Sequence, residues 1–290
     1  MISSEAALED LRREIDRVDD SIHDLLIHRV GIVQRIAQVK REGGLRFRPG
    51  REARMLRRLI ARHRGPFPKP VLARIWREML GATVRMQGEF SIGVYAVNGE
   101  QGCWDLARNH FGAHAPIMLH ASAGQIVSDV AGGKATAGVL PRPREDDPQP
   151  WWPLLLTGEG AMPRIVARLP FAGRIRGRAE DIDAVVIACQ PPEDSGDDIT
   201  LVAIDMADTV SRATLKSAMR RCDLEPLFFA SRHDPNKAGR ETTLTEVKGF
   251  VLQDDKRLQR LAGTPRGGIQ KVQVVGGYAV PLAERMLAEG

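Results

Sequence analysis

The chain has 290 residues, of which 43% are hydrophobic and 27% charged, a composition typical of a globular protein with two or three domains. No apolar run approaches the length of a membrane span, and no basic segment followed by an apolar one begins the chain, so we predict neither a transmembrane helix nor a signal peptide. The three cysteines, Cys103, Cys189 and Cys222, are far apart. They favour free thiols and a cytoplasmic location over a disulfide framework or a metal site.

The positive charge is concentrated near the N-terminus. Residues 1–88 hold 19 Lys and Arg against 11 Asp and Glu, whereas the remainder holds 23 against 26. Such a basic region can bind nucleic acid or a small polyanion. We favour the small anion, because no zinc-finger spacing or aromatic RNA-binding motif accompanies the charge. Part of the excess, including Arg57, Arg58, Arg62 and Arg64, is expected to be a solvated helix face.

The first predicted element is a long amphipathic helix from Ser4, its expected N-cap, to about Arg41. At 1.5 Å per residue it would be roughly 55 Å long. Its apolar residues follow the three- and four-residue spacing of one helix face. This apolar stripe consists of Leu8, Leu11, Ile15, Val18, Ile22, Leu25, Ile32, Ile36 and Val39. Because a helix of this length cannot cover its own stripe, we predict a helical homodimer.

Cations interrupt and border the stripe. Arg29 occupies a position whose neighbours on the face are aliphatic, and Arg12 and Lys40 lie at the edges. Burying a guanidinium is costly unless an anion compensates it. Arg12 or Lys40 alone would usually extend its charged end into water, and an ion pair with a nearby carboxylate would accommodate Arg29. Together, the cations favour a small anionic ligand held between helices.

Two shorter helices are predicted next, from Arg51 to about Arg62 and from Val71 to about Gln87, separated by a break rich in Pro and Gly. The inward positions of the second of these helices are expected to include Val71, Ile75, Leu80 and Val84. After Gly88 the pattern changes to β-α-β-α-β, which predicts an α/β lobe.

Further elements follow along the chain. Two more strands are predicted at 165–169 and 184–188, and we interpret residues 190–198 as an interdomain linker. The last part is predicted as β-α-β-β-α, followed by a strand at 272–275 and a terminal helix from Pro281.

The N-terminal residues carry a family resemblance. The string LEDLRREIDRVDDSIHDLLIHRVGIVQRIAQVK, followed by PGRE and ATVRMQ, resembles the all-helical class of chorismate mutase over about residues 5–88. The resemblance implies a three-helix domain that forms an intertwined dimer, with two sites that each use residues of both chains. It also implies the rearrangement of chorismate to prephenate, without a metal or cofactor.

The resemblance implies a role for each matching residue. The implied catalytic residues are Lys40 and Gln87, which would donate hydrogen bonds to the ether oxygen, and Glu52, which would accept one from the ring hydroxyl. The predicted substrate-binding residues are Arg12 of the neighbouring chain, Arg29, Arg48, Arg51 and Thr83. Arg48 stands where this family commonly has an acidic residue. We expect that departure to alter loop closure or affinity more than the chemistry.

The rest of the chain resembles two further modules. Residues 92–141 resemble the first lobe of prephenate dehydratase, and residues 199–262 resemble the ACT domain, in the order of the bifunctional mutase–dehydratase. The dehydratase string Pro-Ile-Glu-Asn-Ser reads PRPRE at 141–145, and its Thr-Arg-Phe triplet has no match. The ACT effector motif Glu-Ser-Arg-Pro reads ASRH at 230–233. These departures imply that dehydratase activity is absent and that phenylalanine feedback is lost or altered.

We therefore predict a multidomain protein: an all-α domain over 1–88, an α/β lobe over 89–190, and an ACT-like βαββα domain with a tail over 191–290. The predicted function is a cytoplasmic, homodimeric chorismate mutase that binds neither nucleic acid nor membrane. Its non-catalytic C-terminal region would serve packing, effector binding or docking to another pathway enzyme. The alternatives are a bifunctional mutase–dehydratase and a non-catalytic helical dimer that senses anions or nucleic acid.

Overall fold

The protein is described by a computed structural model that covers residues 4–39, 47–97, 102–157, 162–173, 182–233, 239–263 and 268–288. The chain divides into two compact units. The first unit comprises Met1–Arg46 and Thr83–Glu89, and the second comprises Phe47–Ala82 and Phe90–Gly290. None of the helices in these described ranges is both long and apolar enough to cross a membrane.

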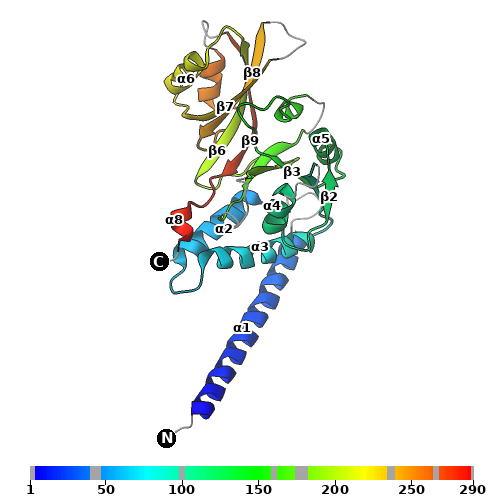
Figure 1. Cartoon of the computed structure of the whole chain (residues 1–290), viewed down its shortest axis with the longest axis vertical. Helices are drawn as coiled ribbons and strands as arrows, with labels where there is room; N and C mark the ends of the chain where they lie inside the picture. Colours follow the sequence, from blue (N-terminus) through cyan, green and yellow to red (C-terminus); the bar gives the residue numbers. More distant parts are fainter. Residues whose placement is uncertain are drawn as a thin grey trace. The chain divides into compact units, whose positions relative to one another are not determined.

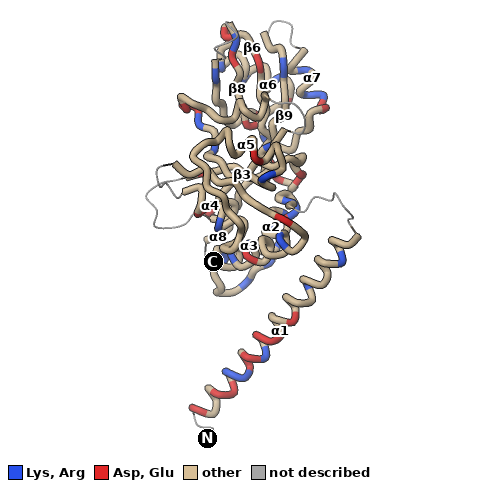
Figure 2. The backbone as a smooth tube through the Cα atoms, turned by 90° about the vertical axis from the view of Figure 1, so that its right-hand side faces the viewer, with Lys and Arg blue, Asp and Glu red and all other residues tan. Residues whose placement is uncertain are grey.

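Helix α1 (Ser4–Val39) forms most of the first unit as one uninterrupted helix of 36 residues (Figure 1). Ser4 is already helical, so its predicted role as the N-cap is wrong. The predicted end at Arg41 lies outside the described residues. The apolar stripe is exposed in the single chain, as Leu25 at 67% and Val39 at 81% illustrate. Acidic and basic residues are interspersed from Glu5 to Asp24, and the charged residues of α1 beyond Asp24 are all basic (Figure 2).

Helices α2 (Pro49–Arg62) and α3 (Lys69–Arg85) confirm the two shorter helices, with bounds that differ by about two residues. Pro49 suits the first turn of α2, because proline has no backbone N–H and an N–H at this position would have no acceptor within the helix. The inward face of α2 is formed by Ala53, Leu56 and Ile60, which pack in one cluster with Phe171 and Leu282. The apolar face of α2 is therefore buried within the second unit.

Nine strands of the described chain form one sheet, in the order β2-β1-β3-β5-β4-β9-β6-β8-β7. The strands are β1 (Ile92–Tyr95), β2 (Ile117–His120), β3 (Ala137–Pro141), β4 (Arg164–Leu169), β5 (Ala184–Ala188), β6 (Asp198–Ala207), β7 (Pro226–His233), β8 (Arg240–Lys248) and β9 (Ile269–Ala279). The accompanying helices are α4 (Gly102–Phe111), α5 (Ala123–Ala131), α6 (Arg212–Arg221), α7 (Lys256–Ala262) and α8 (Glu284–Leu287), with a short 3₁₀ helix at Trp152–Leu155.

The first half of the sheet follows the predicted β-α-β-α-β order. Strand β1 pairs in parallel with β2 and β3, and β5 then pairs antiparallel with β3 and β4. Every residue of β5 is buried, as its unbroken apolar run suggests. Helix α5 contributes Ile126 to a core that also contains Leu140 and Ile187.

The second half of the sheet is antiparallel, with β9-β6-β8-β7 as neighbours and α6 and α7 as connections. This βαββαβ order confirms the ACT-like part of the predicted fold class, whereas the intertwined dimer stays a prediction. Strand β9 has 11 residues, although the sequence predicted a strand only at 272–275. Gly276 interrupts the apolar pattern, but a side chain there would collide with the backbone of Ile165 on β4, where the two halves of the sheet join.

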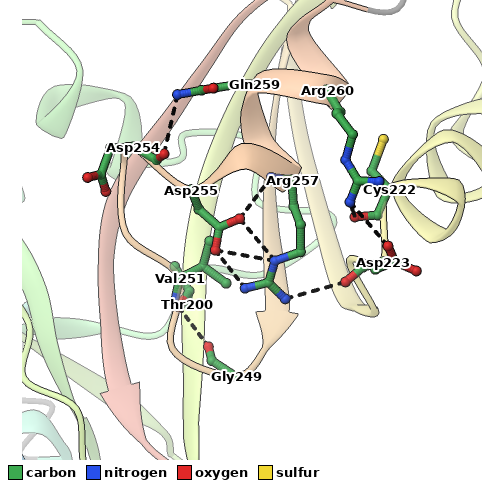
Figure 3. A network of polar contacts seen from close by, with 10 residues as sticks. All are labelled: Thr200, Cys222, Asp223, Gly249, Val251, Asp254, Asp255, Arg257, Gln259 and Arg260. Carbon is green, nitrogen blue, oxygen red and sulfur yellow. Dashed lines mark hydrogen bonds and ion pairs between the residues drawn. The ribbon is translucent and has the colours of Figure 1, made fainter.

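A polar network fixes α7 beside the turn that follows α6 (Figure 3). Asp255 is the N-cap of α7 and accepts hydrogen bonds from the backbone and guanidinium of Arg257. These hydrogen bonds hold the pKa of the Asp255 carboxyl below its ordinary value. Arg260 Nη2 donates to Asp223 Oδ2 at 3.1 Å and Arg257 donates to the Asp223 carbonyl oxygen, so both arginines of α7 stabilise the turn.

Candidate functional site

The predicted site residues are divided between the two units. Arg12, Arg29, Thr83 and Gln87 belong to the first unit, and Arg48, Arg51 and Glu52 belong to the second. Lys40 lies outside the described residues. The geometry of the site is therefore described for each unit by itself.

In the first unit, Arg12 is exposed and its Nη1 donates to Glu9 Oε2 at 3.3 Å, one turn earlier on α1. Arg29 is half-buried in the apolar stripe, as its position in the sequence suggested. Near the end of α3, Thr83 is 6% exposed, and the Gln87 side-chain amide donates to the Thr83 carbonyl oxygen at 3.0 Å. This bond orients Gln87 and leaves its side-chain oxygen and second N–H available for a ligand.

In the second unit, Glu52 of α2 forms a buried ion pair with Arg77 of α3. Arg77 Nη1 donates to Glu52 Oε2 at 2.8 Å, and the two side chains are only 6% and 10% exposed. Burial raises the pKa of Glu52 despite the opposing attraction of Arg77. Since only Oε2 accepts from Arg77, Oε1 keeps its hydrogen-bonding capacity.

Arg77 and His110 are polar residues of this unit that the sequence did not single out. The Arg77 guanidinium lies over the Phe171 ring, 5.3 Å from its centroid. Burial, and then the charge of Arg77, hold the pKa of His110 well below its ordinary value of 6.5. A signal for Arg77 existed, because it follows Ala73 by four residues and precedes Leu80 by three, on the buried face of α3.

The buried face of α3 differs from the prediction. Leu80 and Val84 are buried as predicted, but Val71 and Ile75 are each 45% exposed in the single chain. Apolar residues occur on more than one side of α3, so their spacing in the sequence could not predict which side is buried.

Arg48, the N-cap residue that precedes α2, has a specific partner that explains its departure from the family pattern. Its Nε donates to Glu193 Oε1 at 2.6 Å, and the backbone N–H of Arg51 lies 3.3 Å from Glu193 Oε2. An acid at position 48 would face the Glu193 carboxylate and repel it. A carboxylate at this place is also favoured by the N-terminal dipole of α2. The backbone of α2 lies close to Glu193 at Gly50, where an added Cβ would be 2.6 Å from Glu193 Cβ.

Arg57 anchors the middle of α2 to the same segment, so its expected place on a solvated face is wrong. Its Nη1 donates to the Ser195 carbonyl and hydroxyl oxygens at 3.0 and 2.9 Å. Its Nη2 donates to the Asp197 and Val280 carbonyl oxygens at 2.8 and 2.7 Å. Residues 190–198, interpreted as a linker, are thus bonded along one side of α2.

Comparison with known proteins identifies the helical region. Residues 11–88 match the family Chorismate mutase type II. The N-terminal part of the chain is a chorismate mutase type II domain. All eight predicted site residues, from Arg12 to Gln87, fall within the matched range.

Curated relatives match over a longer stretch. A bifunctional chorismate mutase/prephenate dehydratase of Stutzerimonas stutzeri is 28% identical over 142 residues, which are 46% of this chain and 38% of the relative. The protein of the same description from Neisseria gonorrhoeae is 33% identical over 109 residues, 37% of this chain and 29% of the relative. The matches thus span well under half the length of these relatives.

Solved structures give weaker likenesses. A prephenate dehydratase from Streptococcus mutans has a TM-score of 0.48 and 14% identity, over 67% of this chain and 99% of that one. GqqA, described as a quorum quenching acylase, also has a TM-score of 0.48 and 14% identity, over 68% of this chain and 98% of that one. At these TM-scores neither likeness carries an argument about the chain.

Proposed function

We propose that the chain is a chorismate mutase that converts chorismate to prephenate. The match of residues 11–88 to the chorismate mutase type II family carries this proposal, because that range contains every proposed site residue. The reaction is a [3,3] rearrangement in which the ether C–O bond breaks as a C–C bond forms in the same molecule. No atom is gained or lost, so the reaction requires positioning and charge stabilisation and no nucleophile.

The cations of α1 suit a substrate with two carboxylates. Arg12 of a second copy and Arg29 would each bind a carboxylate through charge-assisted hydrogen bonds. The half-buried position of Arg29 in an aliphatic face supports this role, because a substrate carboxylate would lower the cost of burying the guanidinium. Lys40 and Gln87 would donate to the ether oxygen as negative charge develops there.

Polar residues of α2 and α3 complete the proposed site. Glu52 would accept the ring hydroxyl on Oε1, while Arg77 holds Oε2 and fixes the carboxylate. Thr83 would lie near the ring carboxylate, and Arg51 would support the carboxylate end of the substrate. Arg48 would act indirectly, since its guanidinium is bonded to Glu193.

We propose that the active form is a homodimer and that the C-terminal region is not a dehydratase. The apolar stripe of α1 is exposed along the length of the helix, and large exposed apolar surfaces usually mark interaction sites. A second copy of the chain would cover this stripe.

The altered motif at 141–145 supports the loss of dehydratase activity. A cytoplasmic location fits Cys103, Cys189 and Cys222, which form no disulfide in the described chain. Effector or enzyme docking at the C-terminal region stays a proposal.

Incubation of the purified protein with chorismate tests the activity. We expect chorismate absorbance to fall and prephenate to accumulate, and acid treatment then distinguishes prephenate from phenylpyruvate. Unchanged chorismate would contradict the mutase proposal and favour an anion-binding dimer. Phenylpyruvate formed at neutral pH would instead support the bifunctional alternative.

One substitution and its control test the proposed role of Lys40. Lys40→Ala removes a proposed donor to the ether oxygen and should lower kcat by about 10²–10³-fold. Arg17→Ala is the matched control, because Arg17 is an exposed cation of α1 outside the apolar stripe. Equal turnover of the two variants would overturn the role of Lys40.

A further inference from the structure

A cavity in the second unit lies among α3, α4 and the segment that follows β4. Its volume is about 200 Å³. Helix α3 contributes Ala73, Arg74 and Arg77, and α4 contributes the adjacent residues Asn109 and His110. The remaining wall is formed mainly by Leu106 and residues 169–173. An apolar cavity of about 150 Å³ can bind benzene, so this cavity has room for a ring with one small polar group.

The charged residues of the lining are all basic. Arg74 and Arg77 line the cavity, and no Asp or Glu is among the lining residues of the described chain. The Arg77 guanidinium uses Nη1 for Glu52, and no second hydrogen bond joins it to another described residue. Because a guanidinium has five N–H donors, Arg77 can bond a further anion without leaving Glu52.

Two more polar groups of the lining are available to a ligand. Arg74 is exposed and forms no ion pair with any residue that the structure describes. Asn109 is half-buried, and its side-chain amide likewise has no hydrogen-bond partner in the described ranges. A cation at the exposed edge, a second cation within and an amide on the facing helix would together bind one carboxylate.

The apolar part of the wall restricts the kind of anion. Phe171 offers a ring face that already stacks with Arg77, and Leu106 and Leu169 are buried. A small hydrated anion would leave these surfaces without a partner, whereas an apolar body would cover them. We propose that this cavity binds a small carboxylate with a ring-sized apolar body.

Calorimetric titration of the full-length protein with benzoate tests this proposal and does not depend on turnover. Benzamide has the same ring without the charge, and acetate has the charge without the ring. We expect benzoate to bind once per chain, with both analogues at least about tenfold weaker. No benzoate binding at about 10 mM, or equal binding of benzamide, would overturn the proposal.

Variants locate the bound benzoate. Arg74→Glu should weaken benzoate by about tenfold or more, whereas Arg58→Glu, the same change at an exposed arginine of α2 outside the cavity lining, should not. Arg77→Lys, which keeps the charge beside Glu52 but loses the planar fork, should also weaken it. Arg29→Ala should leave binding unchanged. Loss of binding in Arg29→Ala would place the benzoate in the proposed mutase site and overturn the assignment, as would normal binding by Arg74→Glu.

Discussion

Helices α1 and α2 belong to the same family match, yet their apolar faces have opposite surroundings. The stripe of α1 is exposed in the single chain, with Ile15 at 60% and Leu25 at 67%. The corresponding face of α2 is covered by residues of the C-terminal region, and Leu56 is fully buried. The difference indicates that α2 is stabilised within the chain, whereas the apolar face of α1 is left for the second copy of the proposed homodimer.

Charged residues follow the same division. The ion pairs of α1 join residues one helical turn apart. Because both side chains of each pair are exposed to water, each pair contributes little to stability. Glu52 and Arg57 of α2, and Arg48 at its N-cap, contact residues far away in the sequence, and Glu52 is buried with its partner. We therefore expect substitutions on α2 to change the stability of the second unit, and substitutions on α1 to change association.

The largest expected effect comes from breaking the buried ion pair. Arg77→Ala leaves the Glu52 carboxylate buried without its cation and should lower the free energy of unfolding by about 3–5 kcal/mol. Urea unfolding followed by tryptophan fluorescence measures this, because Trp76, Trp104, Trp151 and Trp152 all belong to the second unit.

A double substitution provides the control for this pair. Arg77→Met combined with Glu52→Gln removes both charges, so it should be clearly more stable than Arg77→Ala. Equal destabilisation by the two variants would show that lost packing, and not the uncompensated carboxylate, causes the effect.

Two leucines compare the faces directly. Leu56→Ala empties a fully buried position on α2 and should destabilise the second unit by about 2–5 kcal/mol. Leu25→Ala on α1 should change the same unfolding transition by less than about 0.5 kcal/mol. A similar loss from both substitutions would contradict the separation between the helices.

Association is tested on α1 by one substitution at two places. Ile15→Asp introduces a charge into the predicted dimer interface and should weaken dimerisation by about a hundredfold, or about 2.7 kcal/mol. Ile27→Asp is the matched control, since Ile27 is 62% exposed and lies on the opposite face of the same helix. Sedimentation velocity measures both. Equal dissociation by the two variants would argue against an interface along the stripe.

The smallest expected effect depends on pH. The pKa of His110 is lowered on folding, so below the ordinary value of 6.5 the unfolded state binds a proton more readily than the folded state. Stability should therefore fall as pH falls from about 6.5, by at most about 1.4 kcal/mol per pH unit. The loss should diminish in His110→Leu when urea unfolding is compared at pH 7.5 and pH 5.5. An unchanged loss in the variant would contradict this cause.

The sequence predicted what depends on local pattern. The stripe of α1 and the buried strand β5 follow from spacing and apolar content, and both are present. The pairing of Arg48 with Glu193 joins residues 145 positions apart, which one sequence cannot indicate. The length of β9 was missed because Gly276 breaks its pattern while serving a close approach to β4. The apolar stripe singled out Arg12, Arg29 and Lys40, whereas the roles of all the site residues came from a family resemblance and are still predictions.

Chain complementation tests the central claim, a site built from the α1 helices of two copies. Arg12→Ala and Arg29→Ala would each be inactive alone, because each removes one carboxylate clamp from every site. Co-expressed chains form mixed dimers in which one of the two sites keeps both arginines, so about a quarter of normal mutase activity should return in the mixture. If mixed dimers form but activity stays at the level of the single variants, each site uses the arginines of one chain and the account is wrong.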